Sequence, residues 1–351
     1  MAETGGSEAT PNPDKDPEEE VASLSSLPME MIVEILGALG FAEFVRFLDQ
    51  VLKSNEKYRD KWDAVIVPGL RIAMLDNHEF TIDGLRWVLN RGFKISNFSI
   101  TPIADEVGGM YGNTFDWVCI KGDLQIVRAY IDLNSVDVNT IDNIYLNNPL
   151  WLASEAGHLE VVEALLAAGA EESVNTPDGY HGSTPLSKAV EGGHLEMVEA
   201  LLAAGAGESV IVPNNVGATA IWLACRAGHL EIAHALLTAG AGETINTPEN
   251  EYGATPLRMA CKGNHLEVVL ALLAFGVEES INRPGGQYRE TPLYSASDHG
   301  NLEMVKALLA AGAEESMNLR TTTIGCQSPL SIAKIRGHSA VVLALKDAAK
   351  K

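Results

Sequence analysis

One short phrase recurs along most of this chain at intervals of about 36 residues. In its clearest form it reads Thr-Pro-Leu, and Gly-His-Leu-Glu or a relative of it follows a few residues later. The second residue of the phrase occupies positions Pro149, Pro185, Ala220, Pro256, Pro292 and Pro329. A fixed period of this size is typical of a solenoid, in which each unit buries its apolar face only against its neighbours. The repeat therefore indicates a binding surface more than a catalytic pocket.

The residues of one unit predict a pair of helices joined by a tight turn. Thr184 can cap a helix that starts at Pro185, because proline has no amide hydrogen to lose there and its φ is already helical. Gly193 ends this helix, and apolar residues at helical spacing then follow from Leu195 onward. We expect Gly205 to end the second helix in the left-handed conformation, which glycine adopts at little cost.

The Thr-Pro-Leu, Gly-His-Leu-Glu and Leu-Leu-Ala-Ala-Gly-Ala phrases resemble the ankyrin repeat, whose unit is two antiparallel helices followed by a projecting hairpin. The resemblance covers residues 113–351 and implies about seven units, with the last one partial or capping. It predicts an all-α fold, an ankyrin-repeat solenoid of helix pairs with hairpin loops. In this family, ligands usually touch the hairpin tips and the exposed side of the first helices.

Two features depart from the ankyrin pattern. The period exceeds the usual length of about 33 residues, and the extra residues fall after the second helix and in the hairpins, so we expect longer hairpins. The histidine that the family places directly after Thr-Pro-Leu is also missing. Its position holds Trp151, Ser187, Trp222, Arg258, Tyr294 and Ser331. Some other packing must replace the hydrogen bonds associated with that histidine.

The repeat register predicts which side chains would contact a partner protein, because equivalent positions line up along a solenoid. The late first-helix set is Glu155, Glu191, Arg226, Lys262 and Asp298. The set that directly follows the phrase is Trp151, Trp222, Arg258 and Tyr294. The hairpin-tip set is Tyr180, Tyr252, Tyr288 and Arg289, and His299 is added from outside the register. Aromatic and arginine side chains are enriched at interface hot spots. For the two tryptophans, packing in place of the missing histidine is an equally good interpretation.

The amino-terminal third predicts a second module. Residues 1–23 are acidic and poor in apolar side chains, which is typical of a disordered tail. Residues 24–67 open with a Leu-Pro helix whose apolar positions share one face. This opening resembles an F-box, the short helical module that docks the Skp adaptor of cullin-RING ubiquitin ligases. The matching residues are Leu27, Pro28, Glu30, Met31, Ile32, Ile35 and Leu36.

A plainer interpretation of the same segment stays open. An open solenoid needs an end unit with a polar outer face, and residues 27–66 could supply it. Residues 68–112, however, look like a degenerate helix pair or N-terminal cap that could fill this role. The preceding Leu-Pro helix would then need another use for its apolar face, and the F-box interpretation provides one.

Composition limits the other classes of function. The formal charge is −22, so nucleic acid and anionic membrane are poor partners. No long apolar stretch, phosphate-binding loop or catalytic motif occurs, which predicts no enzyme activity and no cofactor. Cys119, Cys225 and Cys261 share one repeat position and should be small buried thiols, whereas Cys326 lies in a hairpin.

The repeated histidines also fall one unit apart, too far to share a metal ion, so we expect them to be structural and expect no metal site. A monomer inside the cell is expected, in the cytoplasm or the nucleus. The sequence therefore predicts an adaptor whose F-box-like module recruits a ligase core while the repeat array binds the protein to be modified. The alternative is a plain ankyrin scaffold that binds or sequesters a partner without any link to a ligase.

Overall fold

The computed structural model describes residues 114–350, apart from 133–135, 142–145 and 323–324. The predicted F-box-like segment and residues 1–112 lie outside the described residues. In the described part every regular element is helical, and β pairing is limited to an isolated bridge between Gly285 and Glu290. The all-α prediction for the repeat region is confirmed.

Seven helix pairs follow one another in the described residues. They are α6 (Thr114–Lys121) with α7 (Leu124–Asp132), α8 (Pro149–Ala156) with α9 (Leu159–Ala167), α10 (Pro185–Gly192) with α11 (Leu195–Ala203), α13 (Ala220–Ala227) with α14 (Leu230–Thr238), α15 (Pro256–Lys262) with α16 (Leu266–Phe275), α18 (Pro292–His299) with α19 (Leu302–Ala310), and α20 (Pro329–Arg336) with α21 (Ser339–Ala348). Each first helix packs on the next first helix and each second helix on the next second helix.

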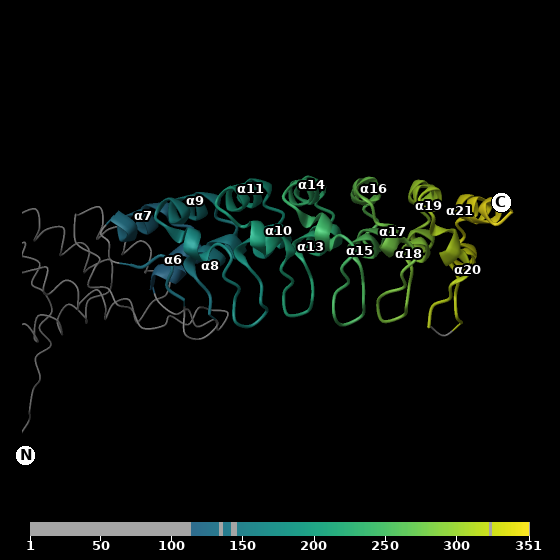
Figure 1. Ribbon diagram of the computed structural model, residues 1–351, viewed down its shortest axis with the longest axis horizontal. Coiled ribbons are helices and arrows are strands. Elements are labelled where there is room, and N and C mark those ends of the chain that lie inside the picture. Colours follow the sequence, from purple (N-terminus) through teal and green to yellow (C-terminus); the bar gives the residue numbers. More distant parts are fainter. Residues whose placement is uncertain (1–113, 133–135, 142–145, 323–324, 351) are drawn as a thin grey trace, which may run out of the picture. The chain divides into compact units, whose positions relative to one another are not determined.

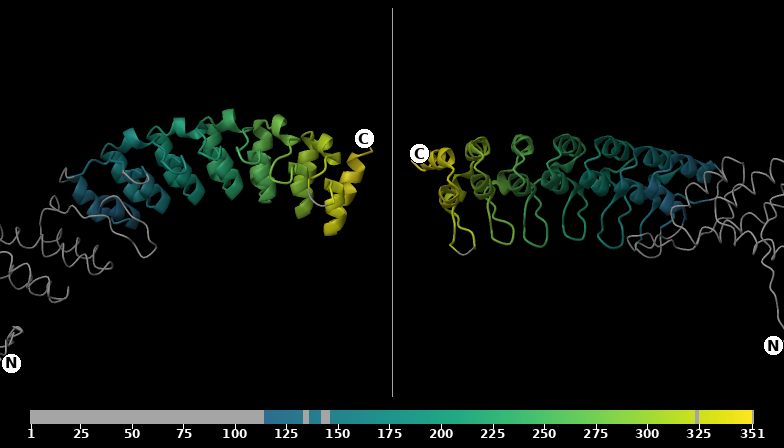
Figure 2. Two further views of the ribbon diagram at one scale, coloured as in Figure 1. Left: turned by 90° about the horizontal axis from the view of Figure 1, so that it is seen from below. Right: turned by 180° about the vertical axis from the view of Figure 1, so that it is seen from behind.

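The arrangement has two helical layers and a row of hairpins (Figure 1). The second helices run along one edge, the first helices lie beneath them, and each hairpin projects beyond the first helices. Figure 2 shows the same row from below and from behind, with the hairpins standing beside one another. The core consists of aliphatic side chains between the layers, and Leu150, Leu186 and Val198 are fully buried in it.

The predicted helix ends are confirmed. Thr184 accepts a hydrogen bond from the Ser187 amide at 3.2 Å, and Pro185 is the first residue of α10. Gly193 follows that helix with φ of 75°, so its left-handed conformation lets the backbone turn directly into α11. The same cap and turn recur in the neighbouring units, which explains why every unit presents its side chains in the same register.

The prediction of longer hairpins needs a correction, because part of the extra length after each second helix folds into a short helical turn. These turns are η3 (Ala170–Ser173), α12 (Gly207–Ile211), η4 (Ala241–Thr244), α17 (Glu278–Ile281) and η5 (Ala313–Asn318). Hydrogen bonds of the Asn175 side chain join these turns to consecutive units. Its Nδ2 donates to the Gly205 carbonyl, and its Oδ1 accepts from the Ser209 hydroxyl at 2.6 Å. The repeated Ser at the end of the turn is therefore a structural residue.

Candidate protein-binding surface

The residues that directly follow the repeated phrase are buried, which favours the packing interpretation for the two tryptophans and argues against the predicted contact role of Arg258 and Tyr294. Trp151, Trp222, Arg258 and Tyr294 are between 2% and 8% exposed. Trp151 Nε1 donates to the Ser183 carbonyl at 2.7 Å and Trp222 Nε1 donates to the Ala254 carbonyl at 2.8 Å. These bonds reach the residue just before the phrase of the next unit, so they take the place of the missing histidine contacts.

Arg258 and Tyr294 make the corresponding links with different chemistry. Arg258 Nε donates to the Glu290 carbonyl at 3.2 Å, and its guanidinium forms an ion pair with the carboxylate of the same residue at 2.5 Å. The Tyr294 hydroxyl donates to the side-chain oxygen of Gln327 at 2.9 Å. Burial raises the pKa of the Tyr294 phenol, with smaller contributions from Asp298 and Glu290, so it stays a neutral donor. Both side chains join units and leave little surface for a partner.

Most charged late first-helix residues form ion pairs with a neighbouring unit, through Lys188, Arg226 and Arg336. Lys188 lies 3.0 Å from the Glu155 carboxylate, Arg226 lies 3.1 Å from that of Glu191, and Arg336 lies 2.7 Å from that of Asp298. Of the two basic residues in this set, Arg226 is therefore neutralised. Among the described residues, Lys262 is the late first-helix charge without an ion pair, and it is exposed.

The repeated histidines join units at the start of the second helices, as predicted. His158 Nε2 donates to the Ile120 carbonyl at 2.7 Å, and His338 Nε2 donates to the Asp298 carbonyl at 3.0 Å. The unit that begins at Pro292 has Asn301 at this position, and there His299 Nε2 donates to the Lys262 carbonyl at 2.8 Å instead. His299 is exposed, but its ring makes the bond between units that a histidine at position 301 would otherwise make. Its predicted role as a contact residue therefore remains untested.

The hairpin tips carry large exposed side chains. Tyr180 is 72% exposed, Val216 54%, Tyr252 48% and Tyr288 45%. In three of these hairpins the exposed side chain lies three residues before the helix cap, at Val216, Tyr252 and Tyr288. In the hairpin that carries Tyr180, His181 occupies this position. The Tyr180 and His181 rings meet edge to face with their centroids 4.6 Å apart. The tips therefore present a row of aromatic and apolar groups, which we call the hairpin row (His181, Val216, Tyr252, Tyr288, with Tyr180).

Backbone hydrogen bonds hold the hairpin row in place. The carbonyls of His181, Val216, Tyr252 and Tyr288 accept from the amides of Asn215, Asn250, Gly286 and Thr322 on the next hairpin, at 2.8 to 2.9 Å. Buried carboxylates brace two of the hairpins internally: Asp178 accepts from three backbone amides of its own hairpin, and so does Glu249. A backbone that is already fixed loses little conformational entropy when a partner binds.

Two of three comparisons with known proteins found a match, and both agree with this geometry. The family model described as ankyrin repeats (three copies) matches residues 115–214, 170–247 and 222–321. The chain belongs to the ankyrin repeat family. A solved structure, the human ASB11 ankyrin repeat domain, is similar with 28% identity and a TM-score of 0.53 over 66% of this chain and 96% of that one. A search of curated protein sequences found no match.

Ankyrin repeats are protein-binding modules that are generally not catalytic, so the hairpin row is the natural candidate for the binding surface of this ankyrin array. Tyr180, Tyr252, Tyr288 and Arg289 were predicted for it from the register. Val216, His181, Arg283 and Arg320 were missed, and all four are exposed in the hairpins. A signal for Val216 and His181 was present, because both occupy the same distance from the helix cap as Tyr252 and Tyr288.

The described part of the ankyrin array holds no group of three or more His, Cys, Asp or Glu side chains suited to a metal ion. Cys119, Cys225 and Cys261 are buried free thiols and Cys326 is exposed, as predicted. No helix in the described residues is long and apolar enough to cross a membrane.

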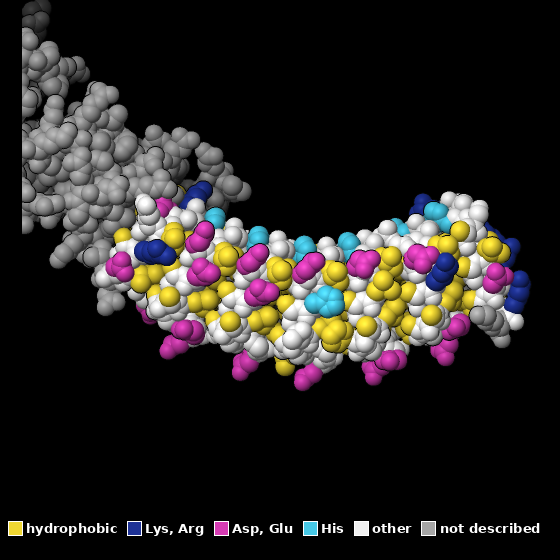
Figure 3. Space-filling view, turned by 90° about the horizontal axis from the view of Figure 1, so that it is seen from above, with side chains coloured by type: hydrophobic (Ala, Val, Ile, Leu, Met, Phe, Trp, Pro, Cys, Tyr) yellow, Lys and Arg dark blue, Asp and Glu magenta, His cyan; other side chains and the backbone are white. Residues whose placement is uncertain are grey.

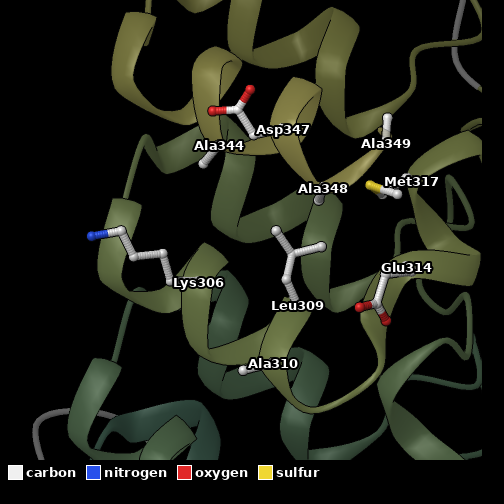
Figure 4. Close-up of a pocket in the computed structure, with 9 residues that line it drawn as sticks. All are labelled: Lys306, Leu309, Ala310, Glu314, Met317, Ala344, Asp347, Ala348 and Ala349. Atoms are coloured by element: carbon white, nitrogen blue, oxygen red, sulfur yellow. The ribbon is translucent and has the colours of Figure 1, made fainter. Parts of the chain in front are cut away.

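One pocket of about 610 Å³ lies where α19, η5 and α21 meet (Figure 4). Leu309 and Met317 supply apolar surface, and the carboxylates of Glu314 and Asp347 lie on opposite sides of it in this view. The lining holds no His, Cys or Ser side chain.

Proposed function

We propose that this chain is a protein–protein interaction adaptor that acts as the substrate receptor of a cullin-RING, SCF-type ubiquitin ligase. In this proposal the F-box-like segment at residues 27–36 binds the Skp adaptor, and the ankyrin array binds the protein to be modified. The observation that carries the proposal is the order of the two motifs in one chain, an F-box-like opening followed by a binding array. The chain itself performs no chemistry.

On the array, the hairpin row is the surface that suits target binding best. Its side chains are exposed, its backbone is fixed by bonds between neighbouring hairpins, and it is rich in the aromatic residues that dominate interface energetics. The first-helix face is less suited, because its late charged positions are mostly paired and its large side chains are buried. Charges that already form pairs gain little from a new partner.

Co-purification of the full chain with a Skp adaptor tests the ligase link. The wild type is compared with a Leu27→Asp, Ile32→Asp double variant, which places two charges on the apolar face of the predicted Leu-Pro helix. A Leu270→Asp, Leu343→Asp variant is the matched control, because it makes the same change at two array leucines that are 41% and 61% exposed. Circular dichroism checks that all three proteins remain helical.

We expect the adaptor to bind the wild type and the control but not the Leu27→Asp, Ile32→Asp variant. The alternative function is an ankyrin scaffold that binds or sequesters a partner without a ligase, and it is favoured by the family match, which falls entirely in the array. Failure of the wild type to bind any Skp adaptor would support that alternative and remove the ligase role.

A further inference from the structure

The charge of the hairpins changes sign along the array. The hairpins at residues 174–183 and 246–254 contain three carboxylates and no Lys or Arg. The hairpin at residues 282–290 and the described residues 319–322 and 325–327 of the next one, which we call the basic hairpins, contain three arginines and one carboxylate. Residues 113–281 as a whole have 22 Asp and Glu against six Lys and Arg, whereas residues 282–351 have six against nine. A locally positive surface therefore stands at one end of a strongly acidic chain.

The carboxylate in the basic hairpins, that of Glu290, already forms an ion pair within the array. Glu290 pairs with the guanidinium of Arg258, whose side chain is only 3% exposed, so this carboxylate neutralises a buried charge from the preceding unit. Arg283 and Arg289 are both exposed and form no ion pair among the described residues. Their guanidinium groups are therefore available to a partner, and each can hold a carboxylate through two parallel hydrogen bonds.

Arg289 also occupies a backbone conformation that an arginine adopts at a cost. Its φ is 54°, in the left-handed region. The equivalent residues of three other hairpins are Gly182, Gly217 and Gly253, which reach this region without a Cβ penalty. A side chain other than glycine is strained there, because its Cβ crowds the following carbonyl. Leu146 and Cys326 hold the equivalent position in two further hairpins with φ of 57° and 44°, so the conformation belongs to the repeat, and at Arg289 it places a long cation next to Tyr288 at the tip.

The two basic hairpins lie side by side. The Thr322 amide donates to the Tyr288 carbonyl at 2.9 Å, so the second hairpin is fixed beside the exposed tyrosine of the first. Arg320, two residues before Thr322, is exposed, and within the described part of the chain its guanidinium donates to the Cys326 carbonyl of its own hairpin, at 3.4 Å. The surface therefore combines three exposed arginines with a tyrosine that is 45% exposed.

We infer that the basic hairpins bind an acidic peptide segment of the target protein, with Arg283, Arg289 and Arg320 facing Asp or Glu side chains and Tyr288 packing against the peptide. This inference rests on the proposed role of the array in target binding. Nucleic acid fits less well, because a long polyanion would extend from these hairpins over the acidic remainder of the array. A short peptide is affected mainly by charges within a Debye length of about 8 Å.

Selection from a display library of random linear peptides tests the inference, with the full chain as bait. We expect Asp and Glu to be enriched in the peptides that the wild type selects. Two variants are then titrated with a selected, fluorescently labelled peptide. Arg289→Gly removes the cation and its charged hydrogen bonds while relieving the strained φ, so we expect at least about tenfold weaker binding without a loss of thermal stability. Arg283→Glu should weaken binding further, and added salt should weaken wild-type binding.

Arg128→Glu is the matched control, because Arg128 is an exposed arginine on α7, far along the sequence from the hairpins. It should bind the selected peptides like the wild type. Peptides without an acidic excess, or acidic peptides that bind Arg289→Gly unchanged, would overturn the inference while leaving target binding by the array intact. A library that yields no binding peptide would contradict it too. Tighter binding by a peptide of residues 8–23 than by any selected peptide would assign the site to the chain's own acidic start.

Discussion

At the scale of single residues, the contact between a histidine and a glycine of the preceding unit recurs through the array. A Cβ on Gly157 would lie 2.7 Å from the His194 ring, and one on Gly193 would lie 2.7 Å from the His229 ring. These glycines also have φ of 81° and 75°. Two requirements, a left-handed backbone and room for the next histidine, therefore act on the same position.

Gly157→Ala should consequently destabilise the array more than Gly169→Ala. Both glycines have positive φ, but a Cβ at Gly169 would meet nothing within 4 Å. Gly169→Ala should cost about 1–2 kcal/mol for its backbone conformation alone. Gly157→Ala should cost about 1–3 kcal/mol more, because the His194 ring must move. Urea unfolding monitored by circular dichroism measures the difference, and equal losses for the two variants would contradict the histidine contact.

The exception to this pattern involves a matched pair of residues. Asn264 stands near the place of the usual glycine with φ of 60°, and the next unit has Asn301 in place of histidine. The Asn301 amide donates to the Asn264 side-chain oxygen at 2.9 Å. The side chain of Asn264 is thus accommodated because the next unit places no histidine ring against it. Asparagine also tolerates the left-handed region better than most residues.

A double-mutant cycle at these two positions should show coupling. Asn301→His alone should destabilise the array, because the new ring meets the Asn264 side chain. Asn264→Gly added to it should recover stability by restoring the pattern of the other units. We expect an interaction energy of about 0.5–3 kcal/mol from the unfolding free energies of the four proteins. Additive effects would show that the two asparagines are independent.

The four thiols should differ sharply in reactivity. Burial raises the pKa of the Cys119, Cys225 and Cys261 thiols well above their ordinary range, and the thiolate is the reactive form. A thiol reagent near neutral pH should therefore modify only Cys326 in the folded protein and all four after unfolding in urea. The Cys326→Ser variant should show no rapid reaction. Rapid modification of a second cysteine in the folded wild type would contradict the burial of these thiols.

At the scale of elements, consecutive units are joined by bonds that differ from unit to unit at one repeat position. Trp222→Phe should keep most of the packing but remove one of the two donors to the Ala254 carbonyl, which also accepts from the Glu249 amide at 3.1 Å. One hydrogen bond contributes about 0.5–1.5 kcal/mol net, so the urea midpoint should fall accordingly. Tyr180→Phe is the control, because its ring is 72% exposed. A Trp222→Phe protein as stable as the wild type would show that the indole bond contributes nothing.

The sequence predicted the helix pairs well, because their ends depend on local signals. Thr184 and Pro185 define a helix start within a few residues, and Gly193 defines its end. The sequence left the burial of Trp222 open and did not predict that of Arg258, since both depend on where these long side chains lie against the next unit. The register identifies equivalent positions but does not say which of them face solvent.

The candidate surface was predicted in part for the same reason. The hairpin-tip tyrosines follow from register, whereas pairing of Arg226 with Glu191 and of Arg336 with Asp298 depends on distances between units. The sequence places Glu290 directly beside Arg289, but in the structure the Glu290 carboxylate forms its ion pair with Arg258 and not with Arg289. The F-box-like residues from Leu27 to Leu36 lie outside the described residues and stay a prediction.

At the scale of the whole molecule, the net charge of −22 should oppose folding through self-repulsion. Salt screens this repulsion, so the urea midpoint should rise as sodium chloride increases from about 20 to about 300 mM. Potassium chloride serves as the control, since screening depends on ionic strength and not on the cation used. A midpoint that falls with both salts would mean that attractive ion pairs dominate the electrostatics of the folded chain.

The central claim is that one chain joins a ligase adaptor to a target. It is tested most directly by asking whether the full chain bound to a Skp adaptor holds a fluorescent acidic peptide at the same time, measured by size-exclusion chromatography with fluorescence detection. We predict a three-component complex that loses only the adaptor in Leu27→Asp, Ile32→Asp and only the peptide in Arg283→Glu, Arg289→Gly. Mutually exclusive binding of adaptor and peptide, or no adaptor binding at all, would contradict the account.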